Sequence, residues 1–306
     1  MSGFKYDGTI DLRPGSAAAQ VLVLVGKNKE VLEVGCATGY MSRVLVERNG
    51  CRVTGIELDP RGAEKAAAVC RRVICGDIES LDLPPELGPF EVIIFGDVLE
   101  HLRRPEETLR RVRPLLGEGG YVVASIPNIT HLSVVLELIR GKFNYRKLGL
   151  LDDTHLRFFC RQTVDRLFRN AGYIITRWGR VAIPPELTEF QTDLELFPEE
   201  LIDYLKKQNP DYETYQFVVR ADKNGEQGSA GGQEGESEVA GAPPEEALLS
   251  GQWHNEAVAG LVERLRQRER VKDREVTRLK KALLEKEREI ARLQRMVAEL
   301  NKGDGY

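Results

Sequence analysis

Short β-branched runs alternate with amphipathic stretches over the first 220 residues of the chain. Seven of these runs are apolar with little internal alternation, which is typical of strands buried on both faces of a sheet. They cover residues 30–34, 52–57, 72–75, 91–95, 120–125, 172–179 and 215–220. The helical stretches between them cover residues 39–47, 60–69, 106–115 and 161–170. This order predicts an α/β fold in which helices cover a largely parallel sheet.

A stretch rich in proline separates the last two predicted strands. It runs from residue 180 to residue 211 and contains Pro184, Pro185, Pro198 and Pro210. Because proline cannot donate to a strand ladder, we expect this stretch to form a lid or an edge rather than part of the central sheet.

The composition changes abruptly at residue 221. The following stretch, DKNGEQGSAGGQEGESEVAGAPP, is rich in Gly, Glu and Ser and has no aromatic residue. Such a segment buries too little surface to offset its chain entropy, so we predict a flexible linker. We therefore divide the chain into a domain at 1–220, an acidic linker at 221–245 and a helix at 246–302.

The last segment has the periodicity of a coiled coil. In alternating steps of four and three from Val258, ten of thirteen positions are apolar. The a positions are Val276, Leu283, Ile290 and Val297, and leucine fills the d positions 279, 293 and 300. This pattern favours a parallel homodimer, although docking to a partner coiled coil is also open. A single amphipathic helix docked on the first domain is the plainer alternative, which so long a linker makes less attractive.

Charge is distributed unevenly along the 306 residues, and the formal net charge of -4 hides this. Residues 1–220 carry a net charge of -2, residues 221–255 carry -6, and residues 256–302 carry +5. A near-neutral first domain argues against nucleic-acid binding, which needs a basic face. The sequence contains no apolar run long enough to span a membrane and begins with no secretory signal, so we expect a cytoplasmic protein.

The cysteine pattern indicates neither a disulfide framework nor a zinc site. The five cysteines are Cys36, Cys51, Cys70, Cys75 and Cys160, and none forms a C-x-x-C pair. We interpret them as reduced thiols that pack as small hydrophobic residues, and we predict no metal site.

The segment VLEVGCATGY is the most informative in the chain. Gly35 and Gly39 flank a tight turn between a strand and a helix, where the missing side chains let a ligand approach the backbone. A dinucleotide-binding fingerprint would need glycine at positions 35, 37 and 40, but Ala37 and Tyr40 occupy two of these. Glu33 would also repel a pyrophosphate, whereas its carboxylate suits a ligand with an ammonium or sulfonium charge.

Three further acidic residues end or follow predicted strands. Glu57 lies 22 residues after Gly35, where a carboxylate accepts hydrogen bonds from both hydroxyls of a ribose. Asp77 follows the third strand, where it could accept from the exocyclic amine of adenine, and Asp97 follows the fourth. Open α/β sheets bind ligands at the carboxyl ends of their strands, so these acids outline one site.

Together these segments resemble the class I S-adenosylmethionine-dependent methyltransferases over roughly residues 15–180. The resemblance rests on the acids and glycines above, on Gly76, and on the motifs GDVLEHL and LLGEGGYVVASIPN. It implies S-adenosylmethionine as cofactor and a Rossmann-like, doubly wound sheet of seven strands with the last one antiparallel. It also places the methionine portion at Glu33 and the glycine turn, the ribose at Glu57, the adenine at Asp77 and Ile78, and the sulfonium beside Asp97. The complete predicted cofactor-binding set is Glu33, Gly35, Cys36, Gly39, Glu57, Leu58, Asp77, Ile78 and Asp97. Within it, we interpret Cys36 as a packing residue.

A second set of motifs resembles a narrower bacterial subgroup. The stretch from DVLEHL to THLSV, followed by LLDDTHLRFF, is similar to ubiquinone-pathway O-methyltransferases and to methyltransferases associated with glycan and polysaccharide assembly. This resemblance implies O-methylation of a small-molecule or glycan hydroxyl. An assembly partner that keeps the fold but acts through its coiled coil is the alternative.

Methyl transfer from a sulfonium mainly requires alignment, and a hydroxyl acceptor also profits from a general base. Three histidines fall near the ligand side of the predicted sheet: His101, His131 and His155. We favour His155, because Asp152 or Asp153 could orient its ring. His101 could instead pair with Asp97, and His131 could instead cap the helix that it begins.

Overall fold

The computed structural model describes residues 10–223 and residue 286. The chain divides into two units, 1–229 and 230–306, and every element given below belongs to the first. Apart from Lys286, the predicted coiled coil at 246–302 lies outside the described residues, as does the predicted linker beyond Lys223.

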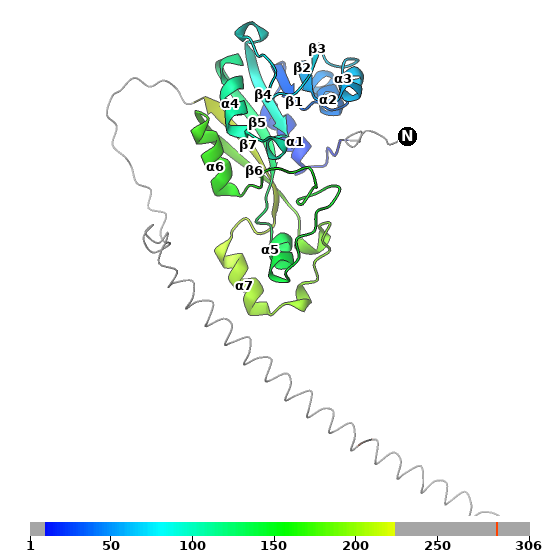
Figure 1. Cartoon of the computed structure of the whole chain (residues 1–306), viewed down its shortest axis with the longest axis vertical. Coiled ribbons are helices and arrows are strands. Elements are labelled where there is room, and N and C mark those ends of the chain that lie inside the picture. Colours follow the sequence, from blue (N-terminus) through cyan, green and yellow to red (C-terminus); the bar gives the residue numbers. More distant parts are fainter. Residues whose placement is uncertain (1–9, 224–285, 287–306) are drawn as a thin grey trace, which may run out of the picture. The chain divides into compact units, whose positions relative to one another are not determined.

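A seven-stranded mixed sheet forms the centre of the first unit (Figure 1). Its strand order is β3-β2-β1-β4-β5-β7-β6. The strands β1 to β5 pair in parallel, whereas β7 is antiparallel to both β5 and β6. The strands are β1 (Glu30–Val34), β2 (Arg52–Glu57), β3 (Arg72–Cys75), β4 (Phe90–Gly96), β5 (Leu116–Pro127), β6 (Tyr173–Ala182) and β7 (Thr214–Lys223). The predicted α/β fold, with seven strands and an antiparallel last strand, is confirmed.

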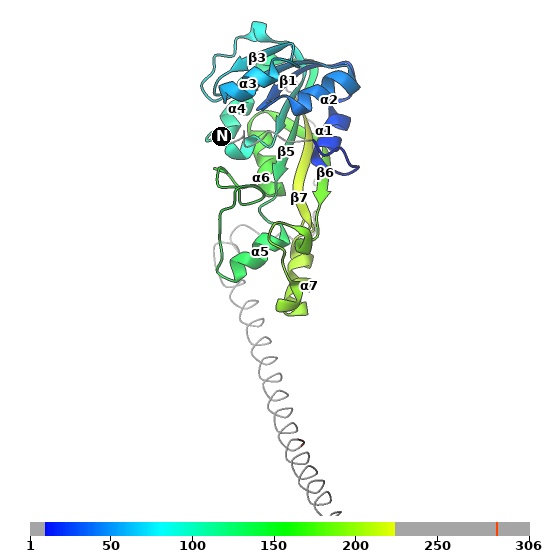
Figure 2. The same ribbon diagram turned by 90° about the vertical axis from the view of Figure 1, so that its right-hand side faces the viewer.

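Helices cover both faces of this sheet (Figures 1 and 2). One face carries α1, α2 and α3, and the other carries α4 and α6. The helices are α1 (Ala17–Val25), α2 (Tyr40–Asn49), α3 (Pro60–Ala66), α4 (Pro105–Val112), α5 (Leu132–Ile139), α6 (Arg161–Asn170) and α7 (Glu199–Gln208). Short 3₁₀ turns are η1 (Pro85–Leu87), η2 (Leu99–His101), η3 (Arg113–Leu115), η4 (Pro185–Leu187) and η5 (Leu194–Leu196).

Alternation along β1 divides the core between these two helical layers. Leu32 and Val34 pack into the cluster on the side of α4 and α6, which includes Leu109 and Phe168. Val31 packs into the opposite cluster with residues of α1 and α2, such as Leu45. Successive strand residues point to opposite faces, so a strand buried on both sides must be apolar throughout. This burial explains why the strands lacked polar alternation in the sequence.

The proline-rich stretch contributes mostly structure outside the sheet. Its first residues complete β6, and the rest forms η4, η5 and α7. The helices α5 and α7 lie together beyond one end of the sheet (Figures 1 and 2), where Leu132 and Leu136 pack against Ile202. This agrees with the expectation of a segment outside the central sheet.

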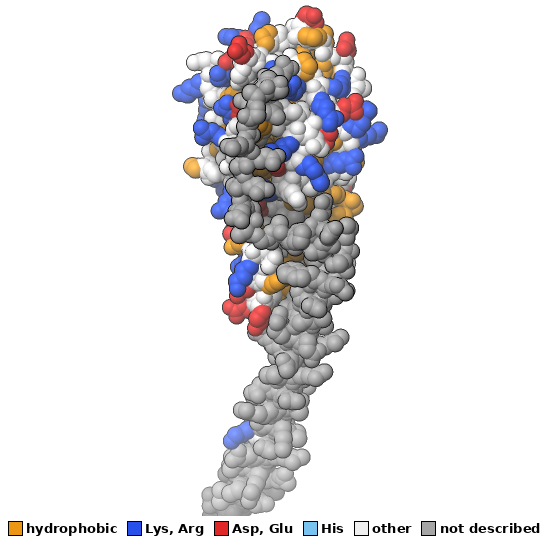
Figure 3. Space-filling model, turned by 90° about the vertical axis from the view of Figure 1, so that its left-hand side faces the viewer, with side chains coloured by type: hydrophobic (Ala, Val, Ile, Leu, Met, Phe, Trp, Pro, Cys, Tyr) orange, Lys and Arg blue, Asp and Glu red, His pale blue; other side chains and the backbone are white. Residues whose placement is uncertain are grey.

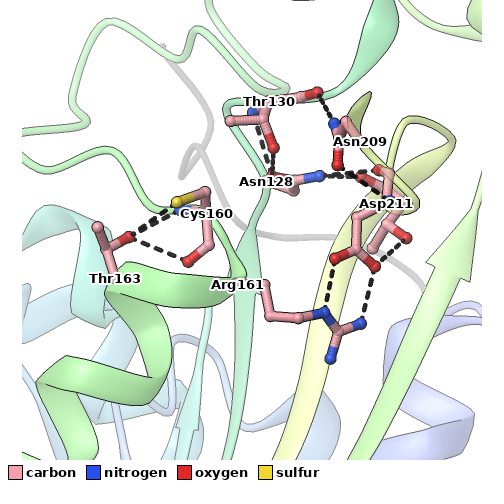
Figure 4. Close-up of polar contacts among 8 residues, drawn as sticks. Asn128, Thr130, Cys160, Arg161, Thr163, Asn209 and Asp211 are labelled. Atoms are coloured by element: carbon pink, nitrogen blue, oxygen red, sulfur yellow. Dashed lines mark hydrogen bonds and ion pairs between the residues drawn. The ribbon is translucent and has the colours of Figure 1, made fainter. Parts of the chain in front are cut away.

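A polar junction ties this outlying part to the sheet (Figure 4). Arg161 at the start of α6 donates to both carboxylate oxygens of Asp211, at 2.6 and 2.7 Å. Asn128 donates through its side-chain amide to the carbonyl oxygens of Asp211 and Thr214, and Asn209 donates to that of Thr130. The chain entering α5 is therefore fixed to the chain entering β7.

The surface of the described residues carries mixed charge. Figure 3 shows basic and acidic side chains interspersed on one face rather than gathered by sign. All five cysteines are free thiols, in agreement with their predicted reduced state. Among residues 10–223 and 286, no helix combines the length and the apolar composition that a membrane crossing needs.

Candidate functional site

A cavity of about 980 Å³ opens at the carboxyl ends of β1, β2 and β4. The strand order reverses between β1 and β4, and open α/β sheets bind ligands at such a switch point. Eight of the predicted site residues line this cavity: Gly35, Glu57, Leu58, Asp77, Ile78, Asp97, His101 and His155. The predicted strand-end acids of β2, β3 and β4 therefore meet in one place.

The turn after β1 has no space for larger side chains. Gly35 has a φ of +71°, and a Cβ added there would lie 2.6 Å from a methyl carbon of Val98. Gly39 has a φ of +79°, and its added Cβ would lie 3.1 Å from the backbone of Ala66. Glycine is required at both positions, because in any other residue the left-handed backbone and these close contacts would both raise the free energy of the folded state. Gly39 itself does not line the cavity; it lets α2 begin close to α3.

Glu57 is held at the end of β2 by the backbone around it. One carboxylate oxygen accepts from the Ala37 amide at 2.7 Å, and the other accepts from the Asp59 amide at 2.9 Å. The side chain is buried and borders the cavity. Each carboxylate oxygen has more than one lone pair, so both remain able to accept from a ligand hydroxyl.

The residues after β2 and β3 give the cavity an apolar rim and an acid. Leu58 follows Glu57 and is 68% exposed on the cavity wall, which is unusual for leucine. Ile78 is buried, and the preceding Asp77 is exposed with one oxygen accepting from the Glu79 amide at 2.8 Å. An aromatic base could pack on the leucine while its amine reaches the carboxylate.

Asp97 lies where β4 ends. Its φ of +54° is left-handed, and its amide and carboxylate both contact the Ser125 hydroxyl on β5. The side-chain amide of Gln216 on β7 donates to the same carboxylate. Although Asp97 is accessible from the cavity, surrounding protein raises its pKa, against the effects of the Ser125 hydrogen bond and the charge of His101.

Glu33 faces a second cavity of about 890 Å³ rather than the first. The two cavities share Gly35, Tyr40 and Asp97 in their walls, so they adjoin at the glycine turn. The Glu33 carboxylate accepts from the Ser42 hydroxyl, and burial raises its pKa to about 8. Glu33 is therefore a buried carboxyl that borders the second cavity beside the glycine turn.

Cys36 lines neither cavity. Its thiol is buried under the turn, near the thiol of Cys70, and fills the space that a Cβ at Gly55 would need. The structure thus places Cys36 as a packing residue, as we interpreted it, and its side chain does not reach the cavity.

His101 and His155 meet in the wall of the first cavity. Their ring centroids lie 4.8 Å apart in an edge-on arrangement. The Nδ1 atom of His101 is 3.2 Å from the Thr154 carbonyl oxygen, and that of His155 is 3.3 Å from the Leu150 carbonyl oxygen. The carboxylate of Asp153, one of the two acids expected to orient His155, pairs with Lys147.

His131, the third candidate base, does not line the cavity, and it has the alternative role of a helix cap. The side chain is fully buried at the start of α5, where its Nδ1 accepts from the Ser133 amide. Its Nε2 lies 2.9 Å from the Ile183 carbonyl oxygen. Burial lowers the pKa of this imidazole, so it is a neutral helix cap.

Glu100 is a site residue that we did not predict, although the motif GDVLEHL contains it. It is 1% exposed on the cavity wall, and neither carboxylate oxygen has a hydrogen-bond partner. Burial and the charges of Asp97 and Asp152 raise its pKa well above the ordinary value. Glutamate is almost never buried without a partner, so its burial marks Glu100 as a site residue. The sequence could not show this, because burial depends on the fold.

Comparison with known proteins agrees with this geometry. A family described as "Methyltransferase domain" matches residues 13–177. The ubiquinone biosynthesis O-methyltransferase of Chromobacterium violaceum is 28% identical over 151 residues, which cover 47% of this chain and 64% of that protein. The enzyme of the same name from Aeromonas salmonicida is 21% identical over 189 residues, covering 59% and 78%. The chain thus spans less than two thirds of the length of the first of these relatives.

Similar solved structures include an S-adenosylmethionine-dependent methyltransferase from Archaeoglobus fulgidus, at a TM-score of 0.48 and 17% identity. The match covers 68% of this chain and 92% of that one. The family match, which spans more than half of the chain, shows that the protein belongs to the methyltransferase-domain family and is a class I S-adenosylmethionine-dependent methyltransferase, with S-adenosylmethionine as its cofactor.

Proposed function

We propose that this protein transfers the methyl group of S-adenosylmethionine to a hydroxyl of a small molecule or glycan. One observation carries the proposal: a single cavity is lined by Glu57 and Asp77 as well as by Asp97 and His155. A nucleoside held by Glu57 and Asp77 would therefore share this cavity with Asp97 and His155.

The residues along the two cavities suit the parts of the cofactor in order. Glu33 would pair with the amino acid ammonium, and Glu57 would accept from the ribose hydroxyls. Asp77, Ile78 and Leu58 would hold the adenine by one hydrogen bond and two apolar contacts. Gly35 lines both cavities and, without a side chain, presents only its backbone there.

The bound cofactor supplies an electrophilic methyl group that already carries its activating charge. The chain's own task is to hold the acceptor in line with that methyl and to exclude water, which accounts for much of such a rate enhancement. His155 and His101 lie on the acceptor wall, where a neutral imidazole can take the proton from a hydroxyl. His155 is our first candidate base.

The choice of a hydroxyl acceptor rests on the relatives. Several are named ubiquinone biosynthesis O-methyltransferase, at 21 to 28% identity. The acceptor end also contains two imidazoles and the buried acids Glu100 and Asp152, so it offers groups that accept and move protons. Incubating the protein with labelled S-adenosylmethionine and cell extract would test this choice. We expect the labelled product to be a methyl ether, and a methyl group on nitrogen or carbon would contradict it.

Calorimetric titration with S-adenosylhomocysteine tests the cofactor site. Replacing the Glu57 carboxylate by Glu57→Gln removes charge-assisted hydrogen bonds to the ribose, which should weaken binding by roughly 10- to 100-fold. The matched control is Glu64→Gln, an exposed change on α3 that should leave binding unchanged. No binding to the unaltered protein at millimolar ligand would refute the enzyme proposal and favour the non-catalytic assembly partner.

We also propose that residues 246–302 pair as a parallel coiled coil, which the heptad pattern supports. Sedimentation equilibrium of the full chain should then give a dimer, and changing the d residues Leu279 and Leu293 to aspartate should give a monomer. A monomeric unaltered chain at high micromolar concentration would contradict the proposal.

A further inference from the structure

Three potential metal ligands meet at the acceptor end of the cavity. Glu100, His101 and His155 each offer one ligand atom, and these atoms all lie within 4.8 Å of one another. Two ligands bound to one ion at 2.0–2.2 Å are at most about 4.4 Å apart. Small side-chain movements would therefore bring all three atoms onto a common ion.

The Glu100 carboxyl is the observation that calls for a ligand. It is 99% buried, borders the cavity, and has no hydrogen-bond partner on either oxygen. Most buried polar side chains have a partner, since an unsatisfied one costs about 1–3 kcal/mol. Asp97 and Asp152 add negative charge beside Glu100, which favours a cation in particular.

Both imidazoles are oriented in the manner of metal ligands. Each has its Nδ1 atom 3.2–3.3 Å from a backbone carbonyl oxygen, that of Thr154 for His101 and that of Leu150 for His155. The Thr154 hydroxyl oxygen also lies 3.2 Å from the Nδ1 atom of His101. In the tautomer whose Nδ1 donates to the carbonyl oxygen, the lone pair of the ring is on Nε2. Metal-binding histidines use the same outer contact to fix their tautomer and ring direction.

The backbone also holds the two halves of the cluster together. The amides of Leu156 and Arg157 both donate to the Glu100 carbonyl oxygen at 2.9 Å. The loop that carries His155 is thus fixed to the turn η2, which carries Glu100 and His101. Such a paired backbone is the preorganisation that a metal site needs.

We propose that Glu100, His101 and His155 bind a divalent first-row transition-metal ion at the acceptor end of the cavity. Two imidazoles and one carboxylate form a donor set typical of Zn²⁺, Fe²⁺ or Co²⁺, whereas Mg²⁺ prefers oxygen ligands alone. Three protein ligands leave coordination positions open to the cavity. If the proposed O-methylation is right, an acceptor hydroxyl oxygen would occupy one of them, and the ion would lower the pKa of that hydroxyl. With the ion bound, His155 would serve as a ligand instead of the general base, and the hydroxyl proton would pass to water.

Metal analysis of the full chain tests the binding itself, apart from catalysis. After treatment with a chelator and dialysis against Zn²⁺, the protein should retain about one more ion per chain than Glu100→Gln or His155→Ala does. Each of these variants should bind that ion at least about 100-fold more weakly, because losing a ligand costs more than losing an outer contact. Glu100→Gln keeps the shape of a buried, uncharged carboxyl, so it should fold normally by circular dichroism.

Two control variants and one spectrum make the result specific. Glu107→Gln, on the exposed face of α4, and His254→Ala, beyond the first unit, should retain the ion. Co²⁺ in the site should give visible ligand-field bands without thiolate charge transfer. Equal metal content in the unaltered protein and the Glu100 and His155 variants would overturn the proposal. Binding of S-adenosylhomocysteine is measured in a separate experiment. If the protein does not bind this ligand, the proposed function is rejected but the metal site is not.

Discussion

The Glu33→Gln substitution should change how the stability of the protein depends on pH. Glu33 is buried with the Ser42 hydroxyl as hydrogen-bond donor, and burial raises its pKa from 4.5 to about 8. Between these two pH values the folded chain binds one more proton than the unfolded chain. Stability from this group is therefore complete below pH 4.5 and is lost as the pH rises through about 8.

The size of the effect follows from one proton. A difference of one bound proton changes the free energy of unfolding by about 1.4 kcal/mol per pH unit, or by about 5 kcal/mol over the whole window. Glutamine does not titrate, so the stability of Glu33→Gln relative to the unaltered protein should rise with that slope. Urea unfolding at several pH values between 5 and 8 measures this difference. If the difference in unfolding free energy between the two proteins does not change with pH, the Glu33 carboxyl is not protonated in the folded chain at these pH values, and the reasoning is refuted.

The same proton should appear in ligand binding. At pH 7 about nine tenths of Glu33 is protonated when its pKa is about 8. An ammonium group beside it would favour the carboxylate, so binding of S-adenosylhomocysteine should release about 0.9 proton per chain. Calorimetry in buffers with different ionisation enthalpies measures this release. Glu33→Gln should release none and bind more weakly, and the exposed Glu64→Gln should behave as the unaltered protein.

Three further substitutions test individual contacts. Gly35→Ala should destabilise the fold by about 1–3 kcal/mol through its left-handed backbone, and should also block nucleoside binding, as thermal melting and calorimetry would show. His131→Ala should lower the free energy of unfolding by about 1–2 kcal/mol, because α5 loses its helix cap, but it should leave the affinity for the nucleoside unchanged. A lower affinity would contradict the purely structural role of His131. Arg161→Met should cost about 1–3 kcal/mol, because it leaves the Asp211 carboxylate largely buried without its partner. Adding Asp211→Asn should recover part of that cost, and a fully additive double variant would argue against the ion pair.

The sheet could be predicted because burial on both faces leaves a simple sequence pattern. The bounds of β1, β2 and β3 match the expected ones, since Gly and Pro residues follow these apolar runs closely. The helix expected at 106–115 ends at Val112, because Pro114 removes a backbone donor and the chain continues as η3. The first helix, α1, was not predicted, because its run AAAQVLVLV is apolar nearly all round and shows no clear period.

Only those site residues whose positions follow from the sheet could be predicted from the sequence. Parallel strands bring their carboxyl ends to one edge, so Glu57, Asp77 and Asp97 could be placed together without coordinates. Whether a histidine caps a helix or faces a cavity depends on its rotamer, so the sequence left both roles open for His131. The cluster of Glu100, His101 and His155 could not be predicted, because Glu100 and His155 are 55 residues apart and come together through a loop.

Glu33 and Glu100 show how burial without a cationic partner distinguishes a binding group from a structural one. A buried carboxyl that serves the fold, such as Asp211, is paired with an arginine, and the pKa of Asp211 is lowered despite burial. Glu33 and Glu100 have no such pair, burial raises the pKa of both, and each faces a cavity. The fold bears this cost in the free chain, and a bound cation would relieve it by neutralising the carboxylate. This difference supports both proposals, in which Glu33 would face the ammonium of the cofactor and Glu100 would bind a metal ion.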